Sequence, residues 1–148
     1  MQPVDGNNGR SATYYPGNPR HATRRMNSAA RRVEGAIRSQ ARLAAEICIN
    51  NKANDVVLME LGSVTDMTDY FVIASGTSDT HVRSIAEHVV TELAAVGIEV
   101  QASEGQVAGR WVVLDFVDFV VHVFHPSLRE FYQLERLWGD APVVALNR

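Results

Sequence analysis

The chain has 148 residues, enough for one domain with a sizeable core and too few for two domains of ordinary size. Hydrophobic residues make up 46% and charged residues 21%, as in water-soluble globular proteins, and no apolar run approaches the length of a membrane span. The single cysteine, Cys48, excludes an internal disulfide and a cysteine-rich zinc site. It indicates an intracellular protein, or one that is indifferent to oxidation.

The net charge of −3 is distributed unevenly along the chain. Residues 1–37 carry six arginines against two acidic residues, whereas residues 38–148 carry eight basic against fifteen acidic residues, a net charge of −7. An acidic domain is a poor non-specific ligand for nucleic acid, because phosphates attract basic side chains. It suits a basic protein partner, since opposite potentials steer two proteins together.

The first 37 residues are rich in glycine, asparagine and proline and show no apolar periodicity. We therefore expect a disordered basic tail over residues 1–37, followed by a folded domain over residues 38–148. Three interpretations of the tail remain open, which are a solvated arm, an organelle transit peptide and an arm that touches nucleic acid.

Helical and strand patterns alternate through the domain. Apolar and small residues at helical spacing predict a first helix from Ala41 to about Asn50. Val56–Leu61 and Tyr70–Ala74 are short runs rich in β-branched and aromatic residues, apolar on both faces, as expected for central strands. An apolar stripe over Val82–Ala94 predicts a second helix, which Gly97 ends.

The C-terminal part contains three further strands and a helix. Ile98–Ser103 alternates apolar and polar residues, which predicts a half-exposed strand near a sheet edge. Trp111–Phe116 and Phe119–His125 are separated by a two-residue link and predict a hairpin. Pro126 begins a last helix that ends before Gly139. These elements predict an α/β (α+β) fold in which helices pack on a mixed five-stranded sheet.

Two patterns offer weak support for phosphate or metal chemistry. The segment Gly76–Ser78 lies between a strand and a helix, where backbone N–H groups could bind a phosphate, although a capped turn has the same sequence. Asp66 with Asp69, and Asp115 with Asp118, could hold Mg²⁺, but turns rich in aspartate are commoner than metal sites. Neither pattern includes the base and lysine of a phosphoryl-transfer site.

The histidines and the cysteine do not complete a catalytic or zinc site. His81 and His88 are two helical turns apart, and His122 and His125 point to opposite faces of a strand. Cys48 lies among apolar helix positions, which favours a small core residue over a reactive thiolate.

Trp111 is the candidate binding residue with the most informative context. It opens a strand directly after the polar pair Gly109-Arg110, and Asp115 and Asp118 are close in sequence. It is either a core residue or the aromatic anchor of a binding hot spot ringed by acidic side chains.

Several linked motifs resemble those of one protein family. They are Asp69–Ser78 (DYFVIASGTS) with His81, Trp111–Asp115 (WVVLD), Asp118–Phe124 (DFVVHVF), Arg129–Tyr132 (REFY) and Leu134–Trp138 (LERLW). In this order and spacing, from about Ala41 to Pro142, they resemble the ribosomal silencing factor family, also called the Iojap family. The resemblance implies a nucleotidyltransferase-like fold that lacks the catalytic set of that superfamily, so it implies no enzymatic activity and no cofactor.

The resemblance also implies a function and a site. Members of the family bind the large ribosomal subunit through universal large-subunit protein fourteen and block joining of the small subunit, which represses translation when nutrients are short. By motif, the ribosome-binding residues carry over to Trp111, Asp115 and Asp118, with Val113 and His122 as neighbours.

Further expectations follow from the resemblance. It implies a homodimer when the protein is free, a cytoplasmic location in a bacterium or an organellar one if the tail is a transit peptide, and no membrane or sequence-specific nucleic acid binding. A nucleotidyltransferase-type enzyme is the alternative function. One departure from the family pattern is Val117, where members commonly have glycine. A β-branched residue tolerates positive φ poorly, so the hairpin turn is expected to differ locally.

Overall fold

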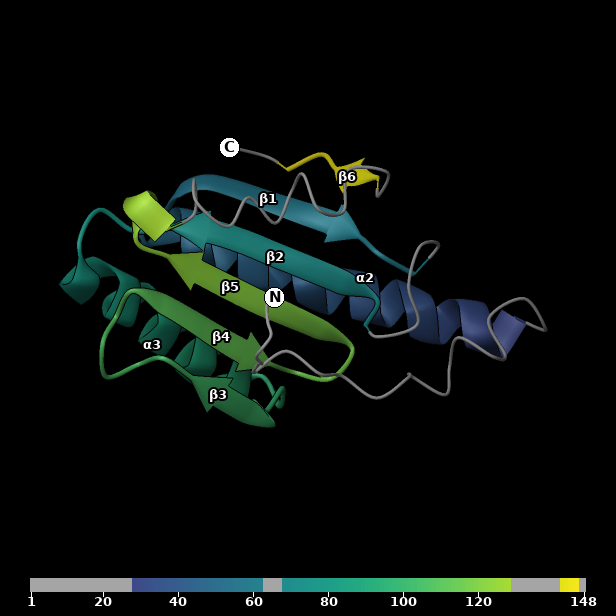
Figure 1. Ribbon diagram of the computed structural model, residues 1–148. Coiled ribbons are helices and arrows are strands. Elements are labelled where there is room, and N and C mark those ends of the chain that lie inside the picture. Colours follow the sequence, from purple (N-terminus) through teal and green to yellow (C-terminus); the bar gives the residue numbers. More distant parts are fainter. Residues whose placement is uncertain (1–27, 63–67, 129–141, 147–148) are drawn as a thin grey trace.

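A mixed sheet with two long helices on one face forms the domain (Figure 1). The computed structural model describes residues 28–62, 68–128 and 142–146. The strands are β1 Asn54–Glu60, β2 Tyr70–Ser75, β3 Ala102–Glu104, β4 Trp111–Asp115, β5 Phe119–Phe124 and β6 Val143–Val144, and the helices are α2 Ser28–Asn50 and α3 Asp79–Ala95. The α+β class and the mixed sheet expected from the sequence are therefore confirmed.

The strands lie in the order β3-β4-β5-β2-β1-β6. The central pair, β2 and β5, is parallel, and every other pair is antiparallel. All residues of both central strands are buried, as expected for apolar runs covered on both faces. The predicted hairpin is present, since β4 and β5 pair from Trp111↔Phe124 to Asp115↔Val120.

Within the described residues the sheet has six strands, so the prediction of five strands was wrong by one. The additional strand is β6, in which Val144 pairs with Leu58 and Val143 with Met59. A two-residue strand is too short to show periodicity, and its pairing depends on the chain returning to β1. The predicted strand over Ile98–Ser103 is also displaced, because β3 begins at Ala102. Ile98 and Val100 instead pack against the core.

The first helix is longer than predicted. α2 begins at Ser28, whereas the apolar pattern predicts a start at Ala41, so residues 28–37 are helical and not part of an unstructured tail. Alanine and arginine favour helix without an apolar stripe, and among the side chains that the structure describes Ile37 is the first buried one. Residues 1–27 and most of the predicted last helix, after Leu128, lie outside the described residues.

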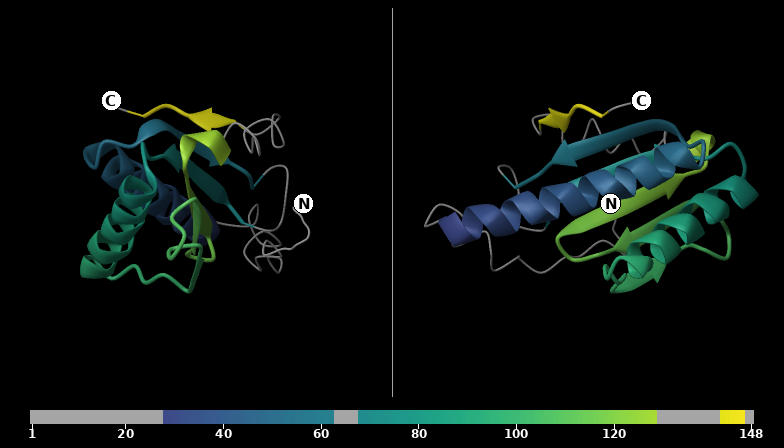
Figure 2. Two further views of the ribbon diagram at one scale, coloured as in Figure 1. Left: turned by 60° about the vertical axis from the view of Figure 1, so that its left-hand side comes forward. Right: turned by 180° about the vertical axis from the view of Figure 1, so that it is seen from behind.

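Apolar side chains fill both faces of the sheet. The larger cluster lies between the sheet and the helices α2 and α3, which Figure 2 shows side by side on one face. Cys48 belongs to this cluster and is completely buried, and burial raises the pKa of its thiol to about 12. It is the small core residue that the sequence predicts. A second cluster, which includes Phe71, Val120 and Phe124, lies on the opposite face of the sheet.

A candidate docking surface on the β4–β5 hairpin

Three of the predicted site residues share one face of strand β4. Trp111, Val113 and Asp115 alternate along the strand and are each partly exposed, whereas Val112 and Leu114 are fully buried against the helices. Because successive strand residues point to opposite faces, the three lie on the face turned away from α2 and α3. We call this row, with Asp118 in the adjoining turn, the hairpin surface.

Trp111 is held by two contacts across the hairpin. Its indole stacks on the ring of Phe124, with centroids 5.0 Å apart and planes inclined by 22°. Its Nε1–H donates a hydrogen bond of 3.2 Å to Nδ1 of His122. Trp111 as a whole is partly exposed, so it is neither a pure core residue nor a free surface side chain. An indole fixed in this way presents a rigid apolar surface at little entropic cost.

His122 lies beneath the hairpin surface and does not form part of its exposed area. It pairs with Val113 in the β4–β5 register and is only 1% exposed. Burial lowers the pKa of its imidazole to about 3, so the ring is neutral at physiological pH. Since Nδ1 accepts the Trp111 hydrogen bond, the ring proton sits on Nε2. Nε2 has no hydrogen-bond partner in the described part of the chain, and the Phe71 ring meets the imidazole edge to face at 4.6 Å.

The turn between β4 and β5 contains the residue that departs from the family pattern. Val117 has a φ of 73°, a value that favours glycine, and the Asp118 N–H donates to the Phe116 carbonyl at 2.9 Å, as in a γ-turn centred on Val117. Further hydrogen bonds hold the turn. Val117 N–H donates to Asp115 Oδ1 at 2.7 Å, Thr68 Oγ1 donates to the Val117 carbonyl at 3.1 Å, and Asp69 N–H donates to the Asp118 carbonyl at 3.0 Å. Val117, a β-branched residue, is therefore held under strain in a region of φ that glycine adopts freely.

Val117→Gly is expected to stabilise the protein by roughly 0.5 to 1 kcal/mol. A side chain in the left-handed region destabilises the folded state by about 1 to 2 kcal/mol, which glycine would relieve. The greater conformational entropy of glycine in the unfolded chain offsets up to about 1 kcal/mol of this gain. Urea unfolding at constant slope measures the difference. Val117→Ala, which keeps a Cβ, is the control and should gain less. A lower urea midpoint for Val117→Gly would show that the turn is not strained.

The segment Gly76–Ser78 forms an N-capped turn, as the capping interpretation predicts. Ser78 Oγ accepts a hydrogen bond from the N–H of His81 at 3.1 Å, and Thr77 N–H donates to Nδ1 of the same histidine at 2.9 Å. A Cβ on Gly76 would lie 2.8 Å from the backbone nitrogen of Val82, so the close approach of strand and helix requires glycine.

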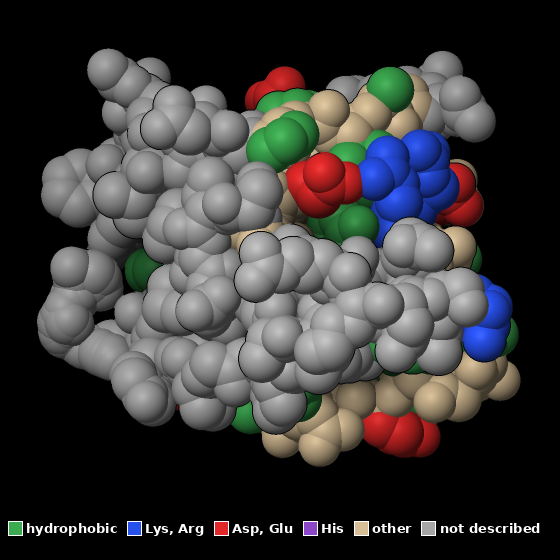
Figure 3. Space-filling model, turned by 90° about the vertical axis from the view of Figure 1, so that its right-hand side faces the viewer, with side chains coloured by type: hydrophobic (Ala, Val, Ile, Leu, Met, Phe, Trp, Pro, Cys, Tyr) green, Lys and Arg blue, Asp and Glu red, His purple; other side chains and the backbone are tan. Residues whose placement is uncertain are grey.

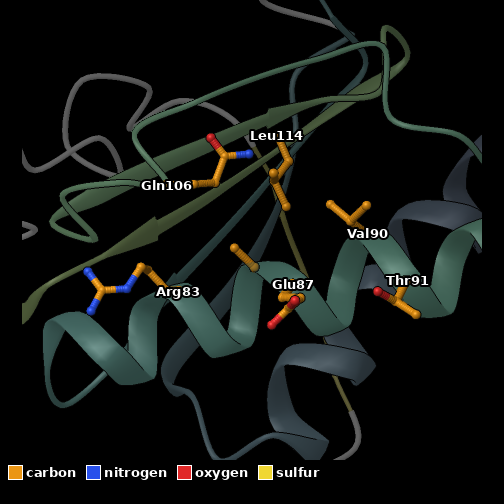
Figure 4. A pocket seen from close by; sticks show the side chains of 7 residues that line it. Arg83, Glu87, Val90, Thr91, Gln106 and Leu114 are labelled. Carbon is orange, nitrogen blue, oxygen red and sulfur yellow. The ribbon is translucent and has the colours of Figure 1, made fainter.

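A hollow of about 430 Å³ lies between α3 and β4, on the side of the sheet opposite the hairpin surface (Figure 4). Its described lining residues are Arg83, Ala86, Glu87, Val90, Thr91, Gln106 and Leu114. The Arg83 guanidinium donates to the carbonyls of Val107 and Ala108, so its charge holds the neighbouring loop. Glu87 is the one carboxylate among these lining residues, which falls short of the paired carboxylates that metal-assisted phosphoryl transfer uses.

The aspartate pairs considered from the sequence belong to no larger metal-binding cluster in the described part of the chain. Within residues 28–62, 68–128 and 142–146, no group of three or more histidine, cysteine, aspartate or glutamate side chains is placed to hold a metal ion. Asp66 lies outside these ranges, and Asp115 accepts a hydrogen bond from the turn. No described helix is long and apolar enough to cross a membrane.

The sequence did not single out two residues that support the hairpin surface. Phe124 carries the indole of Trp111, and Thr68 holds the turn from outside the hairpin. The pairing Trp111↔Phe124 follows from the hairpin register once the two-residue turn is placed. The contact of Phe124 with Trp111 could therefore have been predicted from the sequence. The contact between Thr68 and Val117 spans 49 residues and has no local signal.

Comparison with known proteins agrees with the fold and with the motifs. The family model described as ribosomal silencing factor during starvation matches residues 34–148. The chain is 39% identical over 110 residues to ribosomal silencing factor RsfS of Bacillus subtilis, covering 74% of this chain and 93% of the relative. A crystal structure of a Chromobacterium violaceum protein matches with a TM-score of 0.68 and 33% identity, covering 70% of this chain and 86% of that one.

Organellar proteins are also similar to the chain. The chloroplastic protein Iojap of Zea mays is 31% identical over 108 residues, which cover 73% of this chain and 45% of the maize protein. The family match covers most of the chain, and the bacterial relative aligns over nearly its whole length. The chain belongs to the ribosomal silencing factor family.

Proposed function

We propose that this protein represses translation by binding the large ribosomal subunit through universal large-subunit protein fourteen and sterically blocking the small subunit. Membership in the ribosomal silencing factor family supports a ribosome-associated, regulatory role rather than an enzymatic one. The observation that carries the finer proposal is the hairpin surface, where a fixed, half-buried Trp111 shares one face of β4 with Asp115, and Asp118 follows in the turn. The similarity to bacterial proteins supports a cytoplasmic location for this protein. The similarity to chloroplastic Iojap supports an organellar location as the alternative.

The hairpin surface has the features of a binding hot spot. Hot spots centre on aromatic anchors in well-packed surroundings, and Trp111 is packed on Phe124 while part of its surface stays open. The acidic side chains complement a basic ribosomal protein, whose lysines and arginines also serve to bind RNA phosphates. Steric exclusion requires no chemistry, since covering roughly 800 Å² of the joining face is enough to keep a second partner away.

Sedimentation of purified ribosomal subunits tests the proposal. The full chain should co-sediment with large subunits in a sucrose gradient and should reduce the amount of joined ribosomes when small subunits are added. Joined ribosomes that persist at saturating protein would refute steric repression. Reaction assays and calorimetry with nucleoside triphosphates and Mg²⁺ test the alternative of a nucleotidyltransferase-type enzyme, which predicts binding heat and a product.

Neutralising the acidic residues of the hairpin surface is expected to slow association with the large subunit. Asp115→Asn and Asp118→Asn should each lower the association rate constant several-fold at low salt, with a smaller effect at high salt, because rim charges act mainly through steering. Asparagine keeps the acceptor oxygen that binds the N–H of Val117. Stopped-flow association measures the rate. Glu92→Gln, at an exposed position on α3, is the control, and an equal effect there would argue against this interface.

We also propose that the free protein forms a homodimer, as the family resemblance implies. β3 lies at one edge of the sheet and has three exposed residues, so among the described strands its outer edge is available for pairing with another chain. Light scattering across micromolar concentrations tests this proposal, and a monomer throughout would contradict it.

A further inference from the structure

Strand β3 continues the hairpin surface sideways across the sheet. In the register of β3 with β4, Glu104 lies opposite Val113, and Ala102 lies opposite Asp115. Paired residues of neighbouring strands project to the same face, so Glu104 lies on the face that carries Trp111, Val113 and Asp115. All three residues of β3 are exposed. Glu104 is therefore a surface carboxylate beside the hairpin surface, contributed by a strand outside the hairpin.

The backbone next to Glu104 is packed against the backbone of Trp111. A Cβ on Gly105 would lie 2.0 Å from the carbonyl oxygen of Trp111, and the φ of Gly105 is 90°, so this close approach requires glycine. The carbonyl of Gly105 also accepts a hydrogen bond of 3.0 Å from the N–H of Gly109, within the loop between β3 and β4. Backbone packing therefore fixes the position of Glu104 relative to the strand that carries the indole.

The carboxylate of Glu104 is not neutralised within the described part of the chain, where it has no hydrogen-bond or ion-pair partner. Arg83 on α3 donates to two carbonyls of the loop between β3 and β4, and Arg110 forms an ion pair with Asp79. Figure 3 views the end of the sheet where the turn between β4 and β5 lies. In its lower part, at the level of β3, acidic side chains of the described surface border uncharged groups rather than Lys or Arg. The charge of Glu104 is thus available to a partner.

The face around Val113 combines an apolar strip with two carboxylates. Trp111 and Val113 are partly exposed along β4, and Glu104 and Asp115 are diagonal neighbours on β3 and β4, a relation that places Cβ atoms about 7 to 8 Å apart. Asp115 Oδ1 accepts the hydrogen bond of the turn, so its second oxygen faces no donor in the described part of the chain. Lysine and arginine match this pattern, because their long apolar stems pack on aromatic and aliphatic surface while their charged heads bind carboxylates.

We propose that the docking surface extends over β3, and that Glu104 and Asp115 together bind one lysine or arginine side chain of the partner protein, whose stem lies over Val113 and Trp111. This inference rests on the proposed function and deepens it, since it adds a residue to the interface and names the side chain that the surface selects. A partner with an acidic or apolar residue at this point leaves two carboxylates without a counter-charge, which disfavours its binding. RNA is disfavoured for the same reason, because its phosphates are repelled.

Co-sedimentation of the full chain with purified large subunits gives the dissociation constant that tests the inference. Glu104→Gln keeps the shape of the side chain and is expected to raise this constant about fivefold at low salt, and less at high salt. Ser103→Glu/Glu104→Ser keeps composition and net charge but moves the carboxylate to the opposite face of the exposed strand, so it should bind as weakly as Glu104→Gln. Glu87→Gln, at an exposed position on α3, is the control and should bind like the wild type. Urea unfolding checks that each variant is folded.

A double variant tests whether one partner side chain contacts both carboxylates. If Glu104 and Asp115 share one cation, Glu104→Gln/Asp115→Asn should raise the dissociation constant by less than the product of the two single effects. The reason is that either single substitution already weakens the contact on which the other depends. Two carboxylates that bind different groups would instead give the full product.

Three results would overturn the inference while leaving the proposed function intact, provided that the wild type binds large subunits. One is an affinity of Glu104→Gln equal to or higher than that of the wild type, the higher value being the result expected if RNA phosphates face β3. Another is wild-type affinity of Ser103→Glu/Glu104→Ser, which would reduce the effect to net charge. The third is a double variant with the full product of the single effects. A wild-type chain that does not bind large subunits would contradict the proposed function, and the inference with it.

Discussion

Trp111→Ala is expected to weaken binding to the large ribosomal subunit by about thirtyfold, which corresponds to roughly 2 kcal/mol. The substitution removes the exposed part of the indole, the anchor of the hairpin surface. It also removes the stacking on Phe124 and leaves Nδ1 of His122 without its donor. Because Trp111 is partly exposed, we expect an additional loss of folding free energy of about 2 kcal/mol, less than for a fully buried tryptophan.

The two effects can be separated by measuring them on the same protein. Pelleting with large subunits gives the dissociation constant, and circular dichroism at the same temperature gives the folded fraction, by which the constant is corrected. Trp111→Phe is the matched control, because it keeps an aromatic ring against Phe124 but has no N–H for His122. It should retain more of the binding and lose less stability than alanine. If the Trp111→Ala protein is folded and binds the large subunit as tightly as the wild type, the hairpin surface is not part of the interface.

Acidification is expected to destabilise the protein through His122. The folded state lowers the pKa of this imidazole from 6.5 to about 3 by burial, so only the unfolded chain takes up its proton between these values. Above the unfolded pKa both states have a neutral ring, and the protein has its full stability with respect to this residue. As the pH falls from 6.5 toward 3, protonation stabilises the unfolded chain alone, so the free energy of unfolding decreases progressively. Linkage gives a loss of about 2 kcal/mol between pH 7 and pH 5 from this residue alone.

Urea unfolding at several pH values between 7 and 5 checks this prediction. His122→Asn has no titrating group there, and its amide oxygen can accept the hydrogen bond of the Trp111 indole, so its stability should vary less with pH. His88→Asn, at an exposed histidine on α3, is the control for removing a histidine as such. If wild type and His122→Asn lose stability in parallel, the buried imidazole does not govern the acid response.

Local sequence patterns were sufficient to predict those elements whose periodicity lies within one continuous segment. The central strands were recognised because β2 and β5 are short apolar runs with both faces covered, and α3 because its stripe repeats at helical spacing and follows the capping residue Ser78. The fully buried Cys48 followed from its apolar neighbours in the same way. By contrast, the start of α2 was placed too late because its first turns show no apolar stripe in the sequence, and their described side chains are exposed.

By itself, the sequence determined the α+β class, the hairpin, the uneven charge and the family motifs, because these depend on periodicity, composition and short linked segments. Only the tertiary structure decided that β6 completes the sheet, since two residues pair there with β1 after a long return of the chain. Only it decided that His122 is buried beneath Trp111 and that Val117 is held at positive φ. Those outcomes depend on strand register and on bonds from Thr68 and Asp69, whose partners are distant in sequence and leave no local pattern.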